Sequence, residues 1–515
     1  MKRTLLQACL LTGSMACMAQ MPYTPSQPEG DVTLYSKNSH SYYVLWGFLQ
    51  ETFEKGLVMK SVEADNGKVY LNNQIASYNY TPENWLEFEK DENVLTFHGP
   101  QLLRGNLDTP TNCDYAMVFE FNKTTKEYLP TEKQEFSYRL TEDGMEPMDN
   151  NMIIGYGVLR PADENSAEDY YVWNGYGDCE LRITRHTATT VEIPAKVNME
   201  NRYIVSADGV AHDIKLGRDG DKVYVQGIYK ELPESAIVGT MNDGLVDFGH
   251  ATYLGINTAN NHYVYAMGGQ VQPVWDENNQ TYIDQVTSLL PSLEMEYDAS
   301  TDLYSCVESM AFNSTSNELY ELSLWKDPLL KICHHTPGVP PADPNTLRFI
   351  TLDPGLGWGT YALRCKIPMI DVEDNVLDTS RLSYVYWLNG EEYTLTKDKY
   401  PMCPEDMTFI PFNYTENWWI YVVDEVSRLV YFFFEDYTTF GVQSVYQEED
   451  GTELRSRIIY VGETGINEIA SDTSDIISTA YYTLTGQRVI NPSGLVIKVD
   501  TFSDGTRRST KEIIQ

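Results

Sequence analysis

The stretch that decides the fold is YVWNGYGDCELRITRHT at residues 171–187, because it returns as YELSLWKDPLLKICHHT at residues 320–336. The two copies align without a gap at a constant offset of 149 positions, from 171 to 320 and from 187 to 336. A second matching pair lies upstream in each copy, NGKVYLNN at residues 66–73 and GDKVYVQG at residues 220–227. A repeat of this length is a structural unit. The sequence therefore predicts two tandem modules, at residues 31–187 and 188–336.

The composition of the modules is that of β-strands. Aromatic residues make up 12% of the chain, and 37 residues are tyrosine. Short aromatic or β-branched runs alternate with turn pairs such as Asn66-Gly67, which is the pattern of strands in an antiparallel sheet. We expect an all-β protein in which each module is a sandwich or a small meander barrel. The pattern leaves the choice between these two open.

The rest of the chain is divided by composition. Residues 337–344 contain prolines at short intervals and predict a stiff linker. Residues 345–462 form a further β domain, with a hairpin centred on Asn389-Gly390 and a central strand at 429–434 that is apolar on both faces. Residues 463–515 form a polar spacer followed by a small C-terminal β domain.

The N-terminus is typical of an export signal. Lys2 and Arg3 precede a short apolar run, and Ala19 ends a small-residue cleavage site, so residues 1–19 are expected to be a signal peptide and residues 20–30 a leader. The chain has no other apolar stretch of about 18 residues, so no transmembrane segment is expected. The six cysteines after the signal are widely spaced, and we expect mostly free, buried thiols.

The net charge narrows the choice of partner. The chain carries 75 acidic and 37 basic residues, a formal charge of −38. Nucleic acids and anionic lipids are polyanions and are repelled by such a chain. We therefore expect no nucleic-acid partner.

Two parts of the chain resemble known families. The domain at 345–462 resembles the immunoglobulin or fibronectin type III-like sandwich of exported Bacteroidales proteins, through GVQSVY at 441–446 and RSRIIY at 455–460. The twin modules also resemble repeats in surface proteins of that group. The tail, with YYTLTGQRV at 481–489 and GLVIK at 494–498, is similar to C-terminal sorting domains of the type IX secretion route. This resemblance implies recognition by the secretion machinery and a location at the outer-membrane surface or outside the cell.

We find no signature of catalysis. The Gly-x-Ser-x-Gly elbow, the His-Glu-x-x-His motif, the P-loop and the EF-hand loop are all absent from the sequence. The run Cys333-His334-His335 contains metal-ligand types, but neighbouring residues of a strand point to opposite faces, so a structural role is expected. No catalytic residue, metal or cofactor is predicted.

Exposed aromatic rings are the remaining candidates for function. Trp418 and Trp419 are adjacent, so on a strand one faces the core and the other is free to bind, and Trp358 lies in a glycine-rich turn. The leading hypothesis is a non-catalytic binding or adhesion protein for extracellular glycans or glycoproteins. The alternatives are a structural surface or stalk protein whose modules are spacers, and a carbohydrate-active enzyme with a carboxylate site that has no sequence motif.

Overall fold

The computed structural model describes residues 22–514 with internal gaps. The gaps are 46–47, 76–84, 107, 123, 164–165, 167, 277–280, 332–334, 352–360, 402, 415–418, 433–438, 462–475, 483–487, 490–493 and 503–506. The chain divides into two compact units, residues 1–207 with 211–333 and residues 208–210 with 334–515. The described residues form strands and one short 3-10 turn, Pro110–Asn112, so the expected all-β class is confirmed.

The first module contains an eight-stranded barrel. Its strands pair antiparallel in the order β1, β2, β3, β4, β5, β9, β10 and β12, and β12 pairs back onto β1 to close the ring. The strands are β1 (Asp31–Leu45), β2 (Phe48–Glu63), β3 (Lys68–Asn72), β4 (Trp85–Asp91), β5 (Val94–His98), β9 (Glu135–Leu140), β10 (Gly144–Pro147) and β12 (Tyr170–Arg185). Of the two architectures left open by the sequence, the structure has the barrel.

The second module contains the same barrel. Its strands follow one another around the ring in the order β13, β14, β15, β16, β17, β21, β22 and β25, and β25 pairs with β13 to close it. The strands are β13 (Glu200–Val205), β14 (Ala211–Asp219), β15 (Lys222–Gln226), β16 (Ala236–Asn242), β17 (Leu245–Asp247), β21 (Glu294–Asp298), β22 (Leu303–Cys306) and β25 (Leu329–Lys331). Each strand has its counterpart in the first barrel, so the sequence repeat corresponds to a repeat of strand order.

Each barrel carries a side sheet whose strands are inserted after the fifth and the seventh barrel strands. In the first module β7 pairs with β6, β8 and β11, and β11 pairs with β12. In the second, β19 pairs with β18, β20 and β23, and β23 pairs with β24. These strands are β6 (Gln101–Arg104), β7 (Asp114–Asn122), β8 (Glu127–Pro130), β11 (Met152–Arg160), β18 (Thr252–Asn257), β19 (His262–Asp276), β20 (Thr281–Leu289), β23 (Ser309–Asn313) and β24 (Glu321–Trp325).

The two modules differ at the strand that connects the side sheet to the barrel. In the first copy the single strand β12 serves both, pairing with β11 in its first half and with β10 near its end. In the second copy the same stretch is divided into β24 and β25. Pro328 stands at the break, where the first copy has Cys179 (179 + 149 = 328). Proline has no N–H for a sheet ladder, which explains the interruption.

The barrel core follows from alternation along the strands. In β5, Leu95 and Phe97 are buried while the residues between them are not, and in β9 the same holds for Phe136 and Tyr138. The ring of Phe88 lies 5.7 Å from that of Phe97 and 6.0 Å from that of Tyr138. Burying a side chain of this size contributes roughly 2 kcal/mol.

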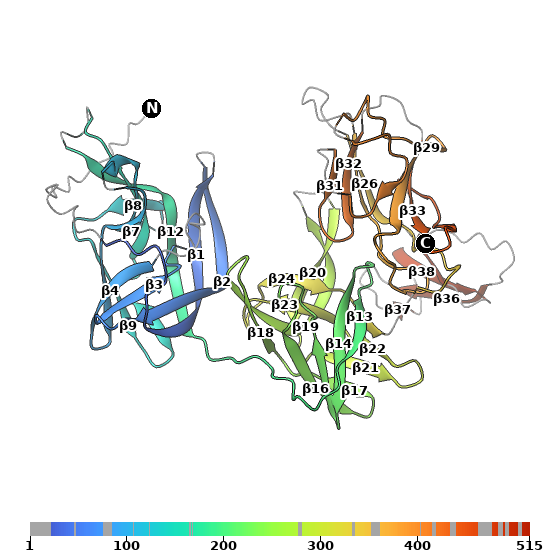
Figure 1. The fold of residues 1–515 in the computed structure, drawn as a ribbon, viewed down its shortest axis with the longest axis horizontal. Coiled ribbons are helices and arrows are strands. Elements are labelled where there is room, and N and C mark those ends of the chain that lie inside the picture. Colours follow the sequence, from blue (N-terminus) through green and yellow to red (C-terminus); the bar gives the residue numbers. More distant parts are fainter. Residues whose placement is uncertain are drawn as a thin grey trace. The chain divides into compact units, whose positions relative to one another are not determined.

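The first barrel is joined to the side sheet of the second module by direct contacts within their unit. Val58 of β2 donates its N–H to the carbonyl of Asn261 at 2.9 Å, and the Ser314 hydroxyl donates to the carbonyl of Lys55 at 2.6 Å. Gly56 lies between them with φ +69°, and a Cβ there would come within 2.1 Å of the Ser314 carbonyl oxygen. The long hairpin of β1 and β2 that provides these contacts is visible in Figure 1. A glycine is therefore required at this junction.

The domain after the barrels is a sandwich of two antiparallel sheets. One sheet has the order β26-β27-β32-β31 and the other β29-β28-β33-β34, with β30 paired to β28 and β35 to β33. The strands are β26 (Asn345–Thr351), β27 (Tyr361–Lys366), β28 (Leu382–Leu388), β29 (Glu391–Tyr393), β30 (Ile410–Pro411), β31 (Ile420–Val422), β32 (Ser427–Phe432), β33 (Phe440–Gln447), β34 (Glu453–Arg455) and β35 (Ile459–Tyr460).

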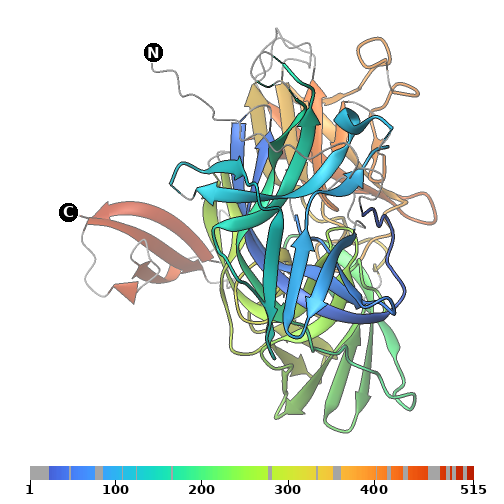
Figure 2. The ribbon, with the colours of Figure 1, turned by 90° about the vertical axis from the view of Figure 1, so that its left-hand side faces the viewer.

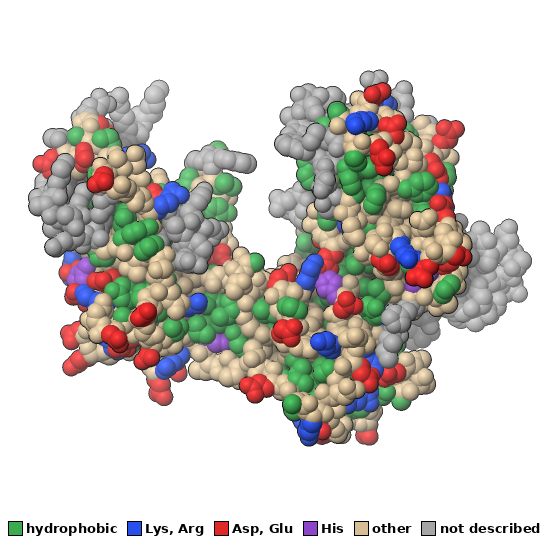
Figure 3. Space-filling view, in the orientation of Figure 1, with side chains coloured by type: hydrophobic (Ala, Val, Ile, Leu, Met, Phe, Trp, Pro, Cys, Tyr) green, Lys and Arg blue, Asp and Glu red, His purple; other side chains and the backbone are tan. Residues whose placement is uncertain are grey.

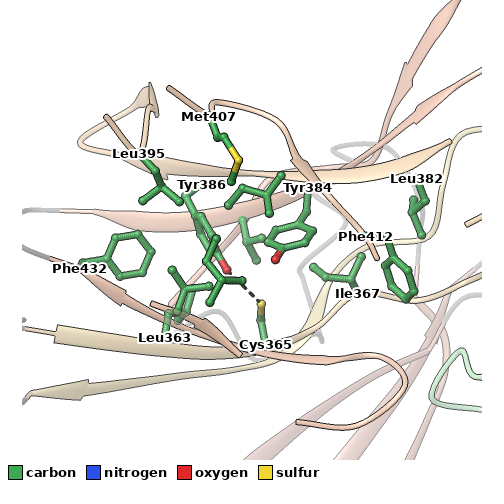
Figure 4. Packing of buried hydrophobic residues seen from close by; sticks show 14 of the residues in the cluster. Leu363, Cys365, Ile367, Leu382, Tyr384, Tyr386, Leu395, Met407, Phe412 and Phe432 are labelled. Atoms are coloured by element: carbon green, nitrogen blue, oxygen red, sulfur yellow. Dashed lines mark hydrogen bonds between the residues drawn. The ribbon is translucent and has the colours of Figure 1, made fainter. Parts of the chain in front are cut away.

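The core of the sandwich is rich in buried tyrosine. Tyr384 and Tyr386 are fully buried between the sheets and pack with Leu363 and Phe432 (Figure 4). The Tyr386 hydroxyl lies 4.0 Å from the Cys365 sulfur. This cluster shows that both sheets share one core.

The C-terminal strands form a separate four-stranded sheet. Its order is β37-β36-β38-β39, with β36 (Ile476–Tyr482), β37 (Arg488–Val489), β38 (Gly494–Phe502) and β39 (Arg507–Ile514). The sheet is drawn in red in Figure 2. Its strands lie within residues 463–515 and belong to the second compact unit.

The surface is predominantly acidic. In the view of Figure 3 the acidic side chains are spread over the described surface rather than gathered in one patch. Over the described ranges, the chain holds no helix with the length and apolar character needed to cross a bilayer.

Candidate functional site

One face of the β31–β32 pair carries aromatic side chains. Ile420 and Val430 are paired across the two strands and point into the core, with 1% and 0% exposure. Alternation along each strand therefore directs Tyr421 and Tyr431 to the other face. The N–H of Tyr431 donates to the carbonyl of Trp419 at 2.9 Å, which extends the pairing by one more position.

Three rings are adjacent at this place. The ring of Tyr431 lies 6.5 Å from that of Trp419 and 5.7 Å from that of Tyr421, both at 73° between planes. Edge-to-face contacts of this kind are favourable for aromatic pairs. Tyr421 is 38% exposed, whereas Trp419 and Tyr431 are half-buried. We call Trp419, Tyr421 and Tyr431 the aromatic surface.

The hydroxyl of Tyr431 remains protonated at neutral pH. Burial raises the pKa of Tyr431, and the neighbouring Tyr421 raises it further. A protonated phenol both donates and accepts hydrogen bonds. The aromatic surface thus combines flat apolar faces with polar groups at their rims.

The three tryptophans predicted from the sequence have different outcomes. Trp358 and Trp418 lie outside the described residues. Trp419 is described, and its ring packs partly against the sandwich core and partly against Tyr431. Sequence reasoning missed Tyr421 and Tyr431. The signal that would have found Tyr421 is its spacing of two residues from Trp419, which places both side chains on one face of an extended chain.

The aromatic surface continues into an apolar edge. β31 is the outermost strand of its sheet, and Val422 and Val423 are 40% and 45% exposed. The sequence predicted a covered central strand at 429–434. Its described part, β32, is paired on both sides, by β27 and β31, yet Leu429 and Tyr431 are only half-buried.

A second candidate is a surface groove of about 340 Å³ beside His335. It is lined by Asp378, Arg381, Tyr446 and Glu448, among others. Burial raises the pKa of Tyr446. Hydrogen bonds from the side chain and the N–H of Ser380 lower the pKa of Asp378. The groove therefore carries a protonated phenol and ionised carboxylates at neutral pH.

His335 is held between two carboxylates in this groove. Its Nδ1 lies 3.1 Å from Asp371 Oδ2, and its Nε2 lies 3.3 Å from Glu448 Oε1. Glu448 also accepts the N–H of Gly338 at 2.6 Å. His335 therefore fastens the start of the proline-rich segment to the sandwich.

The proline-rich segment is bound along its length. Pro341 forms a β-bridge with Asp371, and the N–H of Ala342 donates to the carbonyl of Ile370 at 2.9 Å. Asp343 pairs with the Arg457 guanidinium. Cys333 and His334, which accompany His335 in the sequence, lie outside the described residues. Among the residues that the structure does describe, no group of three His, Cys, Asp or Glu has the geometry to hold a metal ion.

The described thiols and carboxyls offer little reactive chemistry. Cys113, Cys179, Cys365 and Cys403 are buried, and Cys306 is half-buried. Burial raises the pKa of the Cys365 thiol to about 12, so the nucleophilic thiolate is suppressed.

One described carboxyl group, Glu321, has a pKa raised by burial. It accepts the N–H of Val286 at 2.9 Å and so ties the edge of β20 to β24. A raised pKa is a property of general acids. Here the Glu321 carboxyl group accepts a backbone hydrogen bond, so we assign it a structural role.

No protein-family model matches this chain, and a search of curated proteins finds no match to it.

Proposed function

We propose that this chain is a non-catalytic binding protein that contacts glycans or glycoproteins outside the cell. The observation that carries the proposal is the aromatic surface of Trp419, Tyr421 and Tyr431 on the outer side of β31 and β32. Aromatic rings present large contact areas with few rotatable bonds, and they stack on the apolar faces of sugar rings.

The position of the rings supports binding by a preformed surface. Tyr421 and Tyr431 lie on paired strands, and Trp419 directly precedes β31 and accepts the N–H of Tyr431. Their neighbours Ile420 and Val430 are buried in the core. A surface that is ordered before binding loses little conformational entropy when the ligand arrives. The charge of −38 disfavours polyanionic ligands, so neutral glycans are the preferred class.

We further propose that the protein is exported and displayed at the outer-membrane surface or released from the cell. The support is the signal-like stretch at residues 1–19 and the tail that resembles a sorting domain. The mature protein recovered from culture medium or from the cell surface should then begin at Gln20. N-terminal sequencing that reads from Met1 in that material would refute cleavage.

The binding proposal is tested with the purified chain on a panel of immobilised mucins and neutral and acidic polysaccharides. Retained protein and released sugar are measured in the same wells. Tyr421→Ala removes an exposed ring with little effect on the core and should weaken retention by about tenfold, equivalent to about 1.4 kcal/mol. Trp275→Ala is the matched control, because Trp275 is 49% exposed and lies on β19, which belongs to the other compact unit.

The outcomes distinguish the hypotheses. Retention that falls in Tyr421→Ala and not in Trp275→Ala supports binding through the aromatic surface. Equal retention in both variants overturns that site. Released sugar would contradict the non-catalytic proposal and direct attention to carboxyl groups such as Glu321.

The junction between the modules favours a second candidate, a structural surface or stalk protein. One backbone hydrogen bond, from Val58 to Asn261, and one from the Ser314 hydroxyl to the Lys55 carbonyl bind the first barrel to the side sheet of the second module. A spacer benefits from such a junction because it keeps its modules at a fixed separation. Spin labels on the two barrels should then give a narrow distance distribution, and a broad one would argue against a spacer.

A further inference from the structure

Lys37 and Asp178 form a buried pair inside the first barrel. Lys37 lies on β1 and Asp178 on β12, the first and last strands, which pair with each other to close the ring. The lysine Nζ is 2.5 Å from Asp178 Oδ2, and each side chain is 1% exposed. The two groups are therefore in contact and shielded from water.

The lysine nitrogen is oriented by two further acceptors. It donates to the carbonyl of Asn73 at 2.8 Å and to that of Gln74 at 2.9 Å. These two hydrogen bonds occupy two of the three hydrogen positions of the ammonium group, and the third points to Asp178. When the third proton moves to Asp178, the lone pair that remains on nitrogen is directed at the carboxyl group.

Transfer of that proton within the contact converts the ion pair into a neutral amine and a carboxylic acid. A neutral amine is a nucleophile, and a protonated carboxyl group is a better electrophile than a carboxylate. Holding the two in contact removes the entropic cost of their encounter. The exclusion of water also opposes hydrolysis of an amide once it has formed.

We propose that Lys37 and Asp178 condense to an intramolecular amide that links β1 to β12. The bond formed joins Lys37 Nζ to Asp178 Cγ, and the bond broken joins Cγ to one carboxyl oxygen. The ammonium loses two protons, both of which leave with that oxygen as water. Neither group is oxidised or reduced, and the step needs no co-reactant.

The second barrel provides an internal comparison. Arg182 pairs with Asn38, and its repeat counterpart Lys331 (182 + 149 = 331) pairs with Tyr203, so Arg202 occupies the place of Lys37. Arg202 forms its ion pair with Asp302 at 2.7 Å. A guanidinium stays protonated and is a poor nucleophile. The cross-link is therefore expected in the first barrel and not in the second.

The consequence of the cross-link is mechanical. β1 and β12 are the strands that must separate when the barrel opens, and they are far apart in the sequence. An amide between them turns the residues from 37 to 178 into a covalent loop. Such a loop restricts the unfolded state and resists opening under load, as a disulfide does.

The test is the intact mass of the purified full chain after denaturation. The Lys37→Arg variant cannot form the amide, so its mass, minus the mass difference between arginine and lysine, gives the mass of an uncondensed wild-type chain. The measured mass of the wild type should be lower than this by the mass of one water molecule. This comparison does not depend on where the N-terminus is processed. In Asp178→Asn, a condensation would release ammonia in place of water.

Peptide mapping locates the bond. Trypsin should fail to cleave after Lys37 in the wild type, and a peptide joining the Lys37 and Asp178 segments should appear. A wild-type chain with no mass deficit, in which Lys37 is cleaved by trypsin and acetylated after unfolding, would overturn the proposal. The mass is read on the wild type, so the result stands even if a variant fails to fold.

Discussion

Gly56→Ala is expected to destabilise the junction between the two modules by about 2 kcal/mol more than Gly67→Ala. Both glycines have positive φ, +69° and +78°, so both variants carry a similar backbone cost of about 1 kcal/mol. A Cβ at Gly67 meets nothing within 4 Å, whereas one at Gly56 would lie 2.1 Å from the Ser314 carbonyl oxygen. The difference between the variants therefore isolates the contact.

The magnitude comes from the hydrogen bonds that the clash displaces. Moving Ser314 away lengthens its bond to the Lys55 carbonyl, now 2.6 Å, and the Val58–Asn261 bond, now 2.9 Å. Each such bond contributes about 1 kcal/mol net. The assay is hydrogen exchange at the Val58 amide, where about 2 kcal/mol corresponds to an exchange rate roughly 30-fold faster.

Two results would refute this reasoning. Equal exchange at Val58 in Gly56→Ala and Gly67→Ala would mean that the contact with Ser314 contributes nothing. Faster exchange spread over the whole first barrel in Gly56→Ala would mean that the variant destabilises the fold rather than the junction.

Three further predictions concern burial. Burial lowers the pKa of His186, whose ring stacks on that of Tyr263 at 3.9 Å between centroids. The neutral imidazole therefore contributes stability that is fully present above the ordinary pKa of 6.5. This contribution is lost as the pH falls through the lower pKa of the folded state. The urea midpoint should therefore decrease between roughly pH 7 and pH 5, and decrease less in His186→Phe. Leu363→Ala, at a side chain with 0% exposure, should lower the free energy of unfolding in urea by about 3 kcal/mol. Val422→Ala, at a side chain with 40% exposure, should lower it by less than about 0.5 kcal/mol. Similar losses of stability in the two variants would contradict the assigned core. Cys365, with its pKa raised to about 12, should resist iodoacetamide in the native chain and react after unfolding, and rapid native alkylation read by mass spectrometry would be inconsistent with its burial.

Much of the strand content could be predicted from local pattern. The repeated stretch at 66–73 contains β3 (Lys68–Asn72), and the hairpin expected around Asn389-Gly390 is the β28–β29 pair. These predictions succeed because alternation and turn residues act over a few neighbouring positions. The repeat likewise predicted a common architecture, because two copies of one pattern pair their strands in one order.

The candidate site was predictable only in part. Trp419 was found because tryptophan is conspicuous, but its partner Tyr431 lies on a strand that sequence reasoning treated as covered. Whether a strand face is covered depends on what packs over it. In β32, Val430 and Phe432 are buried in the core, whereas Tyr431 is half-buried on the other face. The composition of the strand does not reveal this difference.

The sequence by itself determined that the chain is an all-β protein with two related modules, since strand propensity, turn chemistry and repetition are all local properties. The tertiary structure alone decided that each module closes into a barrel, that Gly56 meets Ser314, and that Lys37 meets Asp178. These contacts join residues far apart in the chain. They depend on strand register, twist and closure, which are set by the packing of the whole barrel rather than by any single segment.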